Sequence, residues 1–241
     1  MKVARGVVLA LLVASTVSAG EQWPHLRHTG YAVVLAPEGS SIRLGLRSIV
    51  KGTFPDWLQY AIIDANGDEV VWDQLRPGSD DEVEYPVRTP GLHVIELVTG
   101  WNVATLSVRG DMPSALIVSQ RLPLQTVGPV ERLYFFVPAG TAEFSVFISA
   151  SVTGEGARLS VNDADGNEAG VIDGDMDTTE KLTVRVPAGH DGRTWSFSIG
   201  KPLTAGTYLD DVLLHFSENI PPYVAETAAA AEAFARMGEQ Q

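Results

Sequence analysis

An internal repeat with a period of about one hundred residues constrains the fold more than any other feature of this chain. Three landmarks recur in the same order in the two halves, at offsets of 101, 99 and 97 residues. They are a strand that runs into Pro-x-Gly at Pro37 and Pro138, an Asp-Ala-[Asn/Asp]-Gly turn at Asp64 and Asp163, and a proline turn between two strands at Pro90 and Pro187. Such near-constant spacing indicates two tandem copies of one fold.

The segments between these landmarks have the pattern of short antiparallel strands. Apolar and polar residues alternate, so that Trp195, Phe197 and Ile199 fall on one face of a strand while Ser196 and Ser198 fall on the other. Gly, Pro, Asn and Asp separate the strands, and helical periodicity is almost absent. We therefore predict an all-β protein of two tandem antiparallel, jelly-roll-like β-sandwich domains.

The predicted domain limits lie where this periodicity breaks. The first sandwich is predicted to span residues 27–110 and the second residues 111–220, with the seam at a Gly-Asp-x-Pro turn. A single large sandwich is the alternative, because all-β domains reach this length. Residues 221–241 form a predicted helical tail. The apolar face of that tail is weak, so we expect a frayed surface helix.

The N-terminal segment has the features of a secretory signal peptide. Lys2 and Arg5 make its start basic, a short apolar run follows, and small residues precede Ala19. We predict that residues 1–19 are a signal peptide and that the mature protein is secreted, to the periplasm or outside the cell. No later apolar run is long enough to predict a membrane span.

Charge and cysteine content limit the partners and the source of stability. The chain has 30 Asp and Glu against 17 Lys and Arg, a net charge of -13. This balance argues against nucleic acid as a partner, because phosphate binding needs basic surface. The chain has no cysteine. We therefore expect stability to come from the apolar cores, with a structural calcium ion as a further contribution and no other cofactor required.

Part of the chain resembles known bacterial sandwich families. The Asp64 turn, the Pro90-Gly91 turn and the strands 92–97 and 103–108 look like the pre-peptidase C-terminal type of β-sandwich, with 92–97 and 103–108 as its final hairpin. Residues 133–223 are similar to sandwich modules at the C-termini of large secreted bacterial proteins, and their Asp210-Asp211 pair resembles that of carbohydrate-binding modules. These resemblances imply a non-catalytic accessory or binding role.

Two groups of carboxylates are candidate calcium ligands. Asp173, Asp175 and Asp177 alternate along one loop, and an extended backbone would put all three on one side. Asp210 and Asp211 open the last strand. In jelly-roll carbohydrate-binding modules a similar pair helps to hold calcium, so that resemblance implies the same here. The alternative for both groups is a carboxylate that is simply solvated.

The two Asp-Ala-[Asn/Asp]-Gly turns also contain clustered oxygen ligands, but their spacing favours a different interpretation. Gly is the fourth residue of each turn, whereas an EF-hand loop needs it at the sixth position. We interpret Asp64 and Asp163 as side chains that cap a hairpin turn, with Gly supplying the positive φ.

The aromatic residues provide the remaining indication of function. Trp101 falls at the predicted tip of a hairpin, where a solvent-facing indole would suit stacking on a sugar ring, and Trp57 precedes a strand and would join it. Packing against a neighbouring loop or the other domain is the alternative for Trp101. Trp72, Trp195 and Tyr134 lie in alternating strands and are predicted to be core residues.

No reaction can be assigned from the motifs. Gly-x-Ser-x-Gly, His-Glu-x-x-His and phosphate-binding Gly-rich loops are absent from the sequence. A glycosidase would need two paired carboxylates, and Glu96, Glu131 and Glu143 cannot be paired from sequence. Our hypothesis is a secreted non-catalytic binding or adhesion protein whose ligand is a polysaccharide or envelope glycan. The alternatives are a structural component of the cell envelope that binds a protein partner, and a hydrolase with an acidic site.

Overall fold

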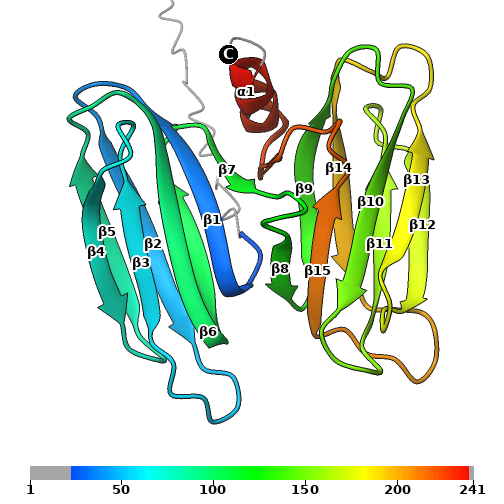
Figure 1. The fold of residues 1–241 in the computed structure, drawn as a ribbon, viewed down its shortest axis with the longest axis horizontal. Coiled ribbons are helices and arrows are strands. Elements are labelled where there is room, and N and C mark those ends of the chain that lie inside the picture. Colours follow the sequence, from blue (N-terminus) through cyan, green and yellow to red (C-terminus); the bar gives the residue numbers. More distant parts are fainter. Residues whose placement is uncertain (1–22, 239–241) are drawn as a thin grey trace, which may run out of the picture.

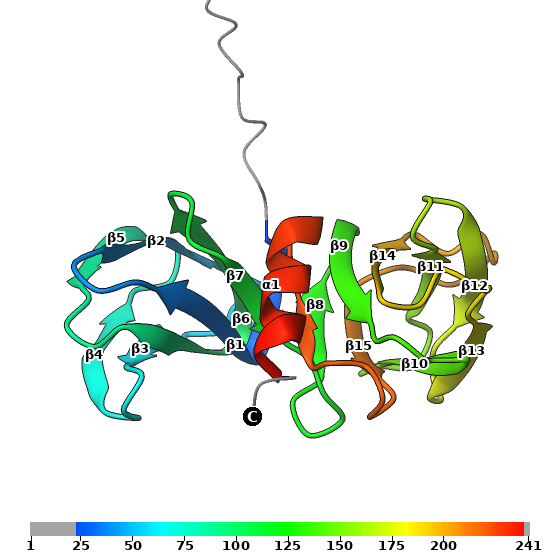
Figure 2. The same ribbon diagram turned by 90° about the horizontal axis from the view of Figure 1, so that it is seen from above.

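The structure, a computed structural model, describes residues 23–238. The predicted signal peptide and its cleavage site lie outside these residues. Two β-sandwiches stand side by side, and one helix packs over the junction between them (Figures 1 and 2). None of the described helices has the length and apolarity needed to cross a membrane. The prediction of antiparallel sandwiches with a short C-terminal helix is thus confirmed.

The strands of the first half alternate in burial as the sequence pattern predicted. They are β1 (Leu26–Ala36), β2 (Ser41–Ile49), β3 (Leu58–Ile63), β4 (Glu69–Leu75), β5 (Asp80–Pro86) and β6 (Gly91–Arg109). One layer has the order β4-β3-β6-β1, and the other layer is formed by β5, β2 and the second part of β6. All of these pairings are antiparallel.

The second half repeats this connectivity. Its strands are β8 (Leu124–Val127), β9 (Val130–Val137), β10 (Glu143–Ala150), β11 (Gly156–Asn162), β12 (Glu168–Asp175), β13 (Glu180–Arg185), β14 (Arg193–Gly200) and β15 (Asp211–Phe216). The layer β12-β11-β14-β9 matches β4-β3-β6-β1, and the layer β13-β10-β15 matches β5-β2-β6. Strand β6 of the first half therefore corresponds to two separate strands, β14 and β15.

The predicted hairpin at Thr99–Asn102 is wrong, because β6 is one continuous strand of 19 residues. Gly100 has a φ of 58° and sits where the pairing with β1 shifts register. This left-handed residue bends the strand, so that Ile95 pairs within one layer while Leu106 pairs within the other. A bent strand replaces the turn because glycine adopts this conformation without a steric penalty.

The two halves share a sheet and a core. Strand β8 pairs with β1 at Leu26 and Thr126, and the Val127 amide donates to the His25 carbonyl at 2.9 Å. One apolar cluster includes buried residues from both halves, such as Ile95 in the first and Phe135 in the second. The position of a boundary between two domains therefore stays a prediction.

The C-terminal helix α1 (Ala228–Gly238) is docked, in contrast to the frayed helix that we expected. Its Phe234 is buried among residues of β1, β7 (Ser114–Ile117) and β9, including Val33, Ala115 and Tyr134. The short strand β16 (Tyr223–Val224) pairs with β7 just before the helix. The weak apolar face is sufficient because the junction supplies a complementary apolar surface.

Candidate functional site

The three predicted calcium ligands of the 173–177 loop are each used by nearby protein groups. Asp173 lies 3.2 Å from Arg158 and accepts the Leu203 amide at 3.0 Å. Burial by itself would raise the pKa of Asp173, but these hydrogen bonds lower it overall. Asp175 accepts the Asp177 amide at 2.9 Å, and Asp177 accepts the Gly154 amide at 2.7 Å.

The other predicted pair, Asp210 and Asp211, lies at the junction of the two halves. Asp211 is buried and forms an ion pair with the buried Arg27, while Asp210 lies 3.8 Å from Lys51. Glu155 is also buried here, and its pKa is raised first by burial and then by the negative charges of Asp211 and Asp210. Asp210 and Asp211 belong to the second half, and their partners Lys51 and Arg27 belong to the first. These ion pairs therefore join the two halves.

Within residues 23–238, no group of three or more His, Cys, Asp or Glu side chains is placed to hold a metal ion. The carboxylates of the two predicted sites have protein partners of their own, as just described. Calcium binding stays a prediction from sequence and does not enter the function proposed below.

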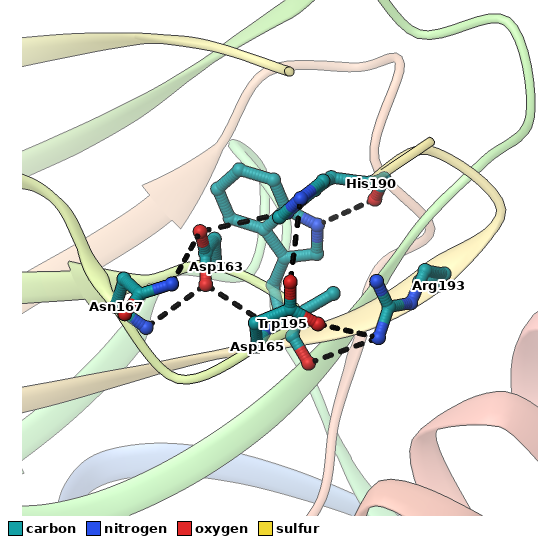
Figure 3. A network of polar contacts seen from close by, with 7 residues as sticks. Asp163, Asp165, Asn167, His190, Arg193 and Trp195 are labelled. Carbon is teal, nitrogen blue, oxygen red and sulfur yellow. Dashed lines mark hydrogen bonds and ion pairs between the residues drawn. The ribbon is translucent and has the colours of Figure 1, made fainter. Parts of the chain in front are cut away.

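The two Asp-Ala-[Asn/Asp]-Gly turns are capped hairpins, as predicted. Asp163 accepts the amides of Asp165 and Asn167, both at 2.9 Å (Figure 3). His190 lies beside the carboxylates of Asp163 and Asp165, with 3.5 Å between a ring nitrogen and a carboxylate oxygen in each case. In the first half, Asp64 accepts the two matching amides at 2.9 and 3.0 Å. These carboxylates stabilise turns, which accounts for their position in the sequence.

Trp101 is 51% exposed, but its ring has several protein contacts. The Phe54 ring stacks on it at a centroid distance of 5.8 Å, and His28 contacts it edge-on at 4.8 Å. Arg27 lies over the ring at 5.6 Å and donates to the Trp101 carbonyl. The Trp101 amide donates to Asp56 at 2.9 Å. The indole is therefore both solvent-facing and held in place.

Trp57 is 39% exposed and has different neighbours from Trp101. The guanidinium of Arg76 lies 5.5 Å from the centre of its ring. Trp57 directly precedes β3, and Arg76, which directly follows β4, has the parity of Trp72 and Gln74 on the outer face. The structure thus places Trp57 at one end of the sheet face that carries Trp72. The preceding residue, Asp56, accepts a hydrogen bond from the Trp101 amide, so Trp57 and Trp101 lie near each other.

The outer face of the layer β4-β3-β6-β1 continues this aromatic surface. Four residues lie in register across it, in the order Trp72, Ala61, Glu96, Tyr31. Trp72 is 55% exposed, so its assignment to the core was wrong. Ala61 is small and leaves a shallow depression of about 40 Å³ between Trp72 and Glu96, with Gln59 at its rim. Trp57 directly precedes β3 and lies four residues from Ala61, on the order of 13 Å for an extended chain.

Tyr31 and Glu96 are hydrogen-bonded to each other on this face. The Tyr31 hydroxyl donates to Glu96 Oε1 at 2.8 Å. The pKa of Tyr31 is raised, first by this hydrogen bond and then by burial and the charge of Glu96. The hydrogen bond fixes the Glu96 carboxylate beside the depression. An aromatic wall, a small-residue floor and an oriented carboxylate together make a surface on which a ring-shaped polar ligand can stack.

The sequence contained a signal for Trp72 that our reading of β4 missed. Val71 and Leu75 pack against the core and share one parity, and Trp72 and Gln74 have the opposite parity. Val70 has the parity of Trp72 and also packs against the core, so only a phase set by Val71 and Leu75 would have placed Trp72 outside. In contrast, Trp195 is 1% exposed and Tyr134 is half-buried beneath α1, in agreement with their predicted core roles.

Comparison with known proteins yields similarity of fold only. No protein-family model and no curated protein matches the chain. Similar solved structures include the M60 catalytic domain with the CBM51-1 and CBM51-2 domains from Clostridium perfringens ZmpB, with TM-score 0.26 and 8% identity, covering 80% of this chain and 36% of that one. Another is the CBM22-1-CBM22-2 tandem domain from Paenibacillus barcinonensis Xyn10C, with TM-score 0.25, 10% identity and 81% of each chain.

Both similar structures contain carbohydrate-binding modules in tandem. This chain spans 36% of the length of the ZmpB chain, so the activity of that whole protein is no guide to this one. The TM-scores are too low to support an argument about the site. The resemblance to pre-peptidase C-terminal domains stays an expectation from sequence.

Proposed function

We propose that this chain is a non-catalytic glycan-binding protein that acts after secretion. The observation that supports this function is the outer sheet face of the first half, where the exposed Trp72 lines a depression with Gln59 and Glu96, and Tyr31 donates to the Glu96 carboxylate. A sugar ring presents an apolar face and equatorial hydroxyls, so it matches an indole flanked by amide and carboxylate groups. Secretion is supported by the predicted signal peptide.

Trp72 forms the centre of the proposed site, and the two residues predicted from sequence extend it. Trp57 lies against Arg76 at the end of the face that carries Trp72, and Trp101 lies near Trp57 because its amide donates to Asp56. The separation of Trp57 from the depression, on the order of 13 Å, exceeds one sugar ring. The proposed ligand is therefore an oligosaccharide or polysaccharide that lies along β3.

The test is binding of residues 20–241 to soluble and insoluble polysaccharides, measured by affinity electrophoresis and pull-down. We expect Trp72→Ala to lose about 2 kcal/mol of binding free energy, roughly thirtyfold in Kd, because the ring supplies the stacking surface. For Trp57→Ala and Trp101→Ala we expect smaller losses that grow with the length of the oligosaccharide.

Leu203→Ala is the matched control, because Leu203 is 76% exposed but lies in the second half. Its binding should equal that of the unmodified protein. Failure to bind any glycan, or equal binding by the Trp72→Ala protein, would contradict the proposed function. A structural or protein-binding role and a hydrolase stay as alternatives from sequence, and no feature of the described residues favours either.

A further inference from the structure

Glu96 brings a negative charge to the proposed site, which a neutral sugar would not balance. It is half-buried in the centre of the outer face, beside the depression above Ala61. Among the ion pairs of residues 23–238, none involves Glu96. Its hydrogen bond comes from a neutral hydroxyl, that of Tyr31. The carboxylate is thus oriented without a protein cation to balance its charge.

The surroundings of Glu96 favour a positively charged ligand. The Trp72 indole forms the opposite wall of the depression, and an indole face attracts a cation. Other formal charges at the ends of this face are Glu69, which pairs with Ile63, and Arg76, which directly follows β4 and lies over the Trp57 ring. The net charge of -13 adds long-range attraction for a cationic polymer and repulsion for an anionic one.

We infer that the preferred ligand of this face is a glycan that contains amino sugars, with a free ammonium group directed at Glu96. This inference rests on the proposed function, since it names the chemical class of the glycan. The sugar ring stacks on Trp72, and the ammonium group donates to the carboxylate that Tyr31 holds in place. A charge-assisted hydrogen bond of this kind is stronger than one between neutral groups.

The test compares two oligosaccharides of the same linkage and length, one built of glucosamine and one of N-acetylglucosamine. Both have the same ring and hydroxyl groups, but in mildly acidic buffer, where the test is done, only the glucosamine oligomer is cationic. We expect residues 20–241 to bind the glucosamine oligomer about tenfold more tightly in isothermal titration calorimetry at low salt. The preference should shrink as salt increases, because salt screens exposed charges.

Two variants assign this preference to Glu96. Glu96→Gln keeps an oxygen that accepts from Tyr31 but removes the charge, so we expect it to bind the two oligomers equally. Asp73→Asn removes one negative charge from the residue next to Trp72, on the opposite side of β4, and should keep the tenfold preference. This control separates a local effect from the effect of net charge.

The outcomes distinguish this inference from the proposed function. Equal or tighter binding of N-acetylglucosamine oligomers by the unmodified protein would overturn the inference and leave glycan binding in place. A preference that survives in Glu96→Gln, or that is lost equally in Asp73→Asn, would also overturn it. Binding of no glycan by the unmodified protein would overturn both.

Discussion

The two sandwiches have the same connectivity, but their matching outer faces have different chemistry. In the first half, Ala61 pairs with Trp72 and Glu96. In the second, Ser160 pairs with Val171 and Ser198 at the equivalent positions. The indole and the carboxylate are thus replaced by an aliphatic side chain and a hydroxyl. Backbone pairing survives these changes because it depends on inward-facing residues, and outward-facing residues are free to differ.

A second difference concerns the neighbouring pair on the same face. Gln59 and Gln74 lie opposite each other in the first half, and their equivalents are Arg158 and Asp173. The latter two form an ion pair at 3.2 Å, whereas no ion pair of the described residues involves Gln59 or Gln74. The comparison shows that a repeated fold carries different side chains on its two matching outer faces.

The largest effect that we expect concerns the contact that joins the halves. Arg27→Ala removes the partner of the buried Asp211 and should lower the free energy of unfolding by about 3–5 kcal/mol, because an unpaired charge stays buried. Chemical denaturation followed by fluorescence measures this. Arg43→Ala is the control, since the exposed Arg43–Glu84 pair should contribute about 1 kcal/mol or less. Equal effects of the two variants would contradict this prediction, because the buried pair would then contribute no more than an exposed one.

The next effect concerns the bend that distinguishes β6 from β14 and β15. Gly100 has a positive φ, and a Cβ there would lie 2.6 Å from Asp56 Cγ. We expect Gly100→Ala to cost about 1–3 kcal/mol of unfolding free energy. Gly200 ends β14 with open space for a Cβ, so Gly200→Ala should change the thermal midpoint little. If both variants melted alike, the bend would not depend on glycine.

The smallest effect concerns the turns that the halves share. The pKa of Asp163 is lowered: burial by itself would raise it, but its hydrogen bonds and the nearby His190 outweigh burial. The lowered pKa adds stability above the ordinary value of 3.8, and this stability is lost as the pH falls through the lowered pKa.

Asp163→Asn should therefore be less stable than the unmodified protein at neutral pH, with the difference vanishing in acid. Acid titration of the far-ultraviolet circular dichroism checks this. Asp64→Asn should behave in the same way, because the pKa of Asp64 is lowered by the equivalent hydrogen bonds, first that from the Asp68 amide. A pH-independent difference would mean that the turn amides are bonded equally well by a neutral side chain.

The comparison of the halves also shows which predictions from sequence were reliable. Alternation predicted the buried Trp195, and the Asp-x-[Asn/Asp]-Gly spacing predicted both turns, because these features depend on residues close in the chain. The bend at Gly100 was read as a hairpin because a glycine between two strands has the same local signature in both structures. Local patterns do not show which strand pairs with which.

The sequence by itself determined the repeat, the class of fold, the turns and the terminal helix, since strand period and turn chemistry are local properties of the chain. Only the tertiary structure decided that Trp72 and Glu96 lie on one face, because these residues are joined through β3, a strand distant in sequence from β6. It also decided that Asp211 is the partner of Arg27, 184 residues away. A site assembled across strands depends on register, and register is settled by the packing of the whole sheet.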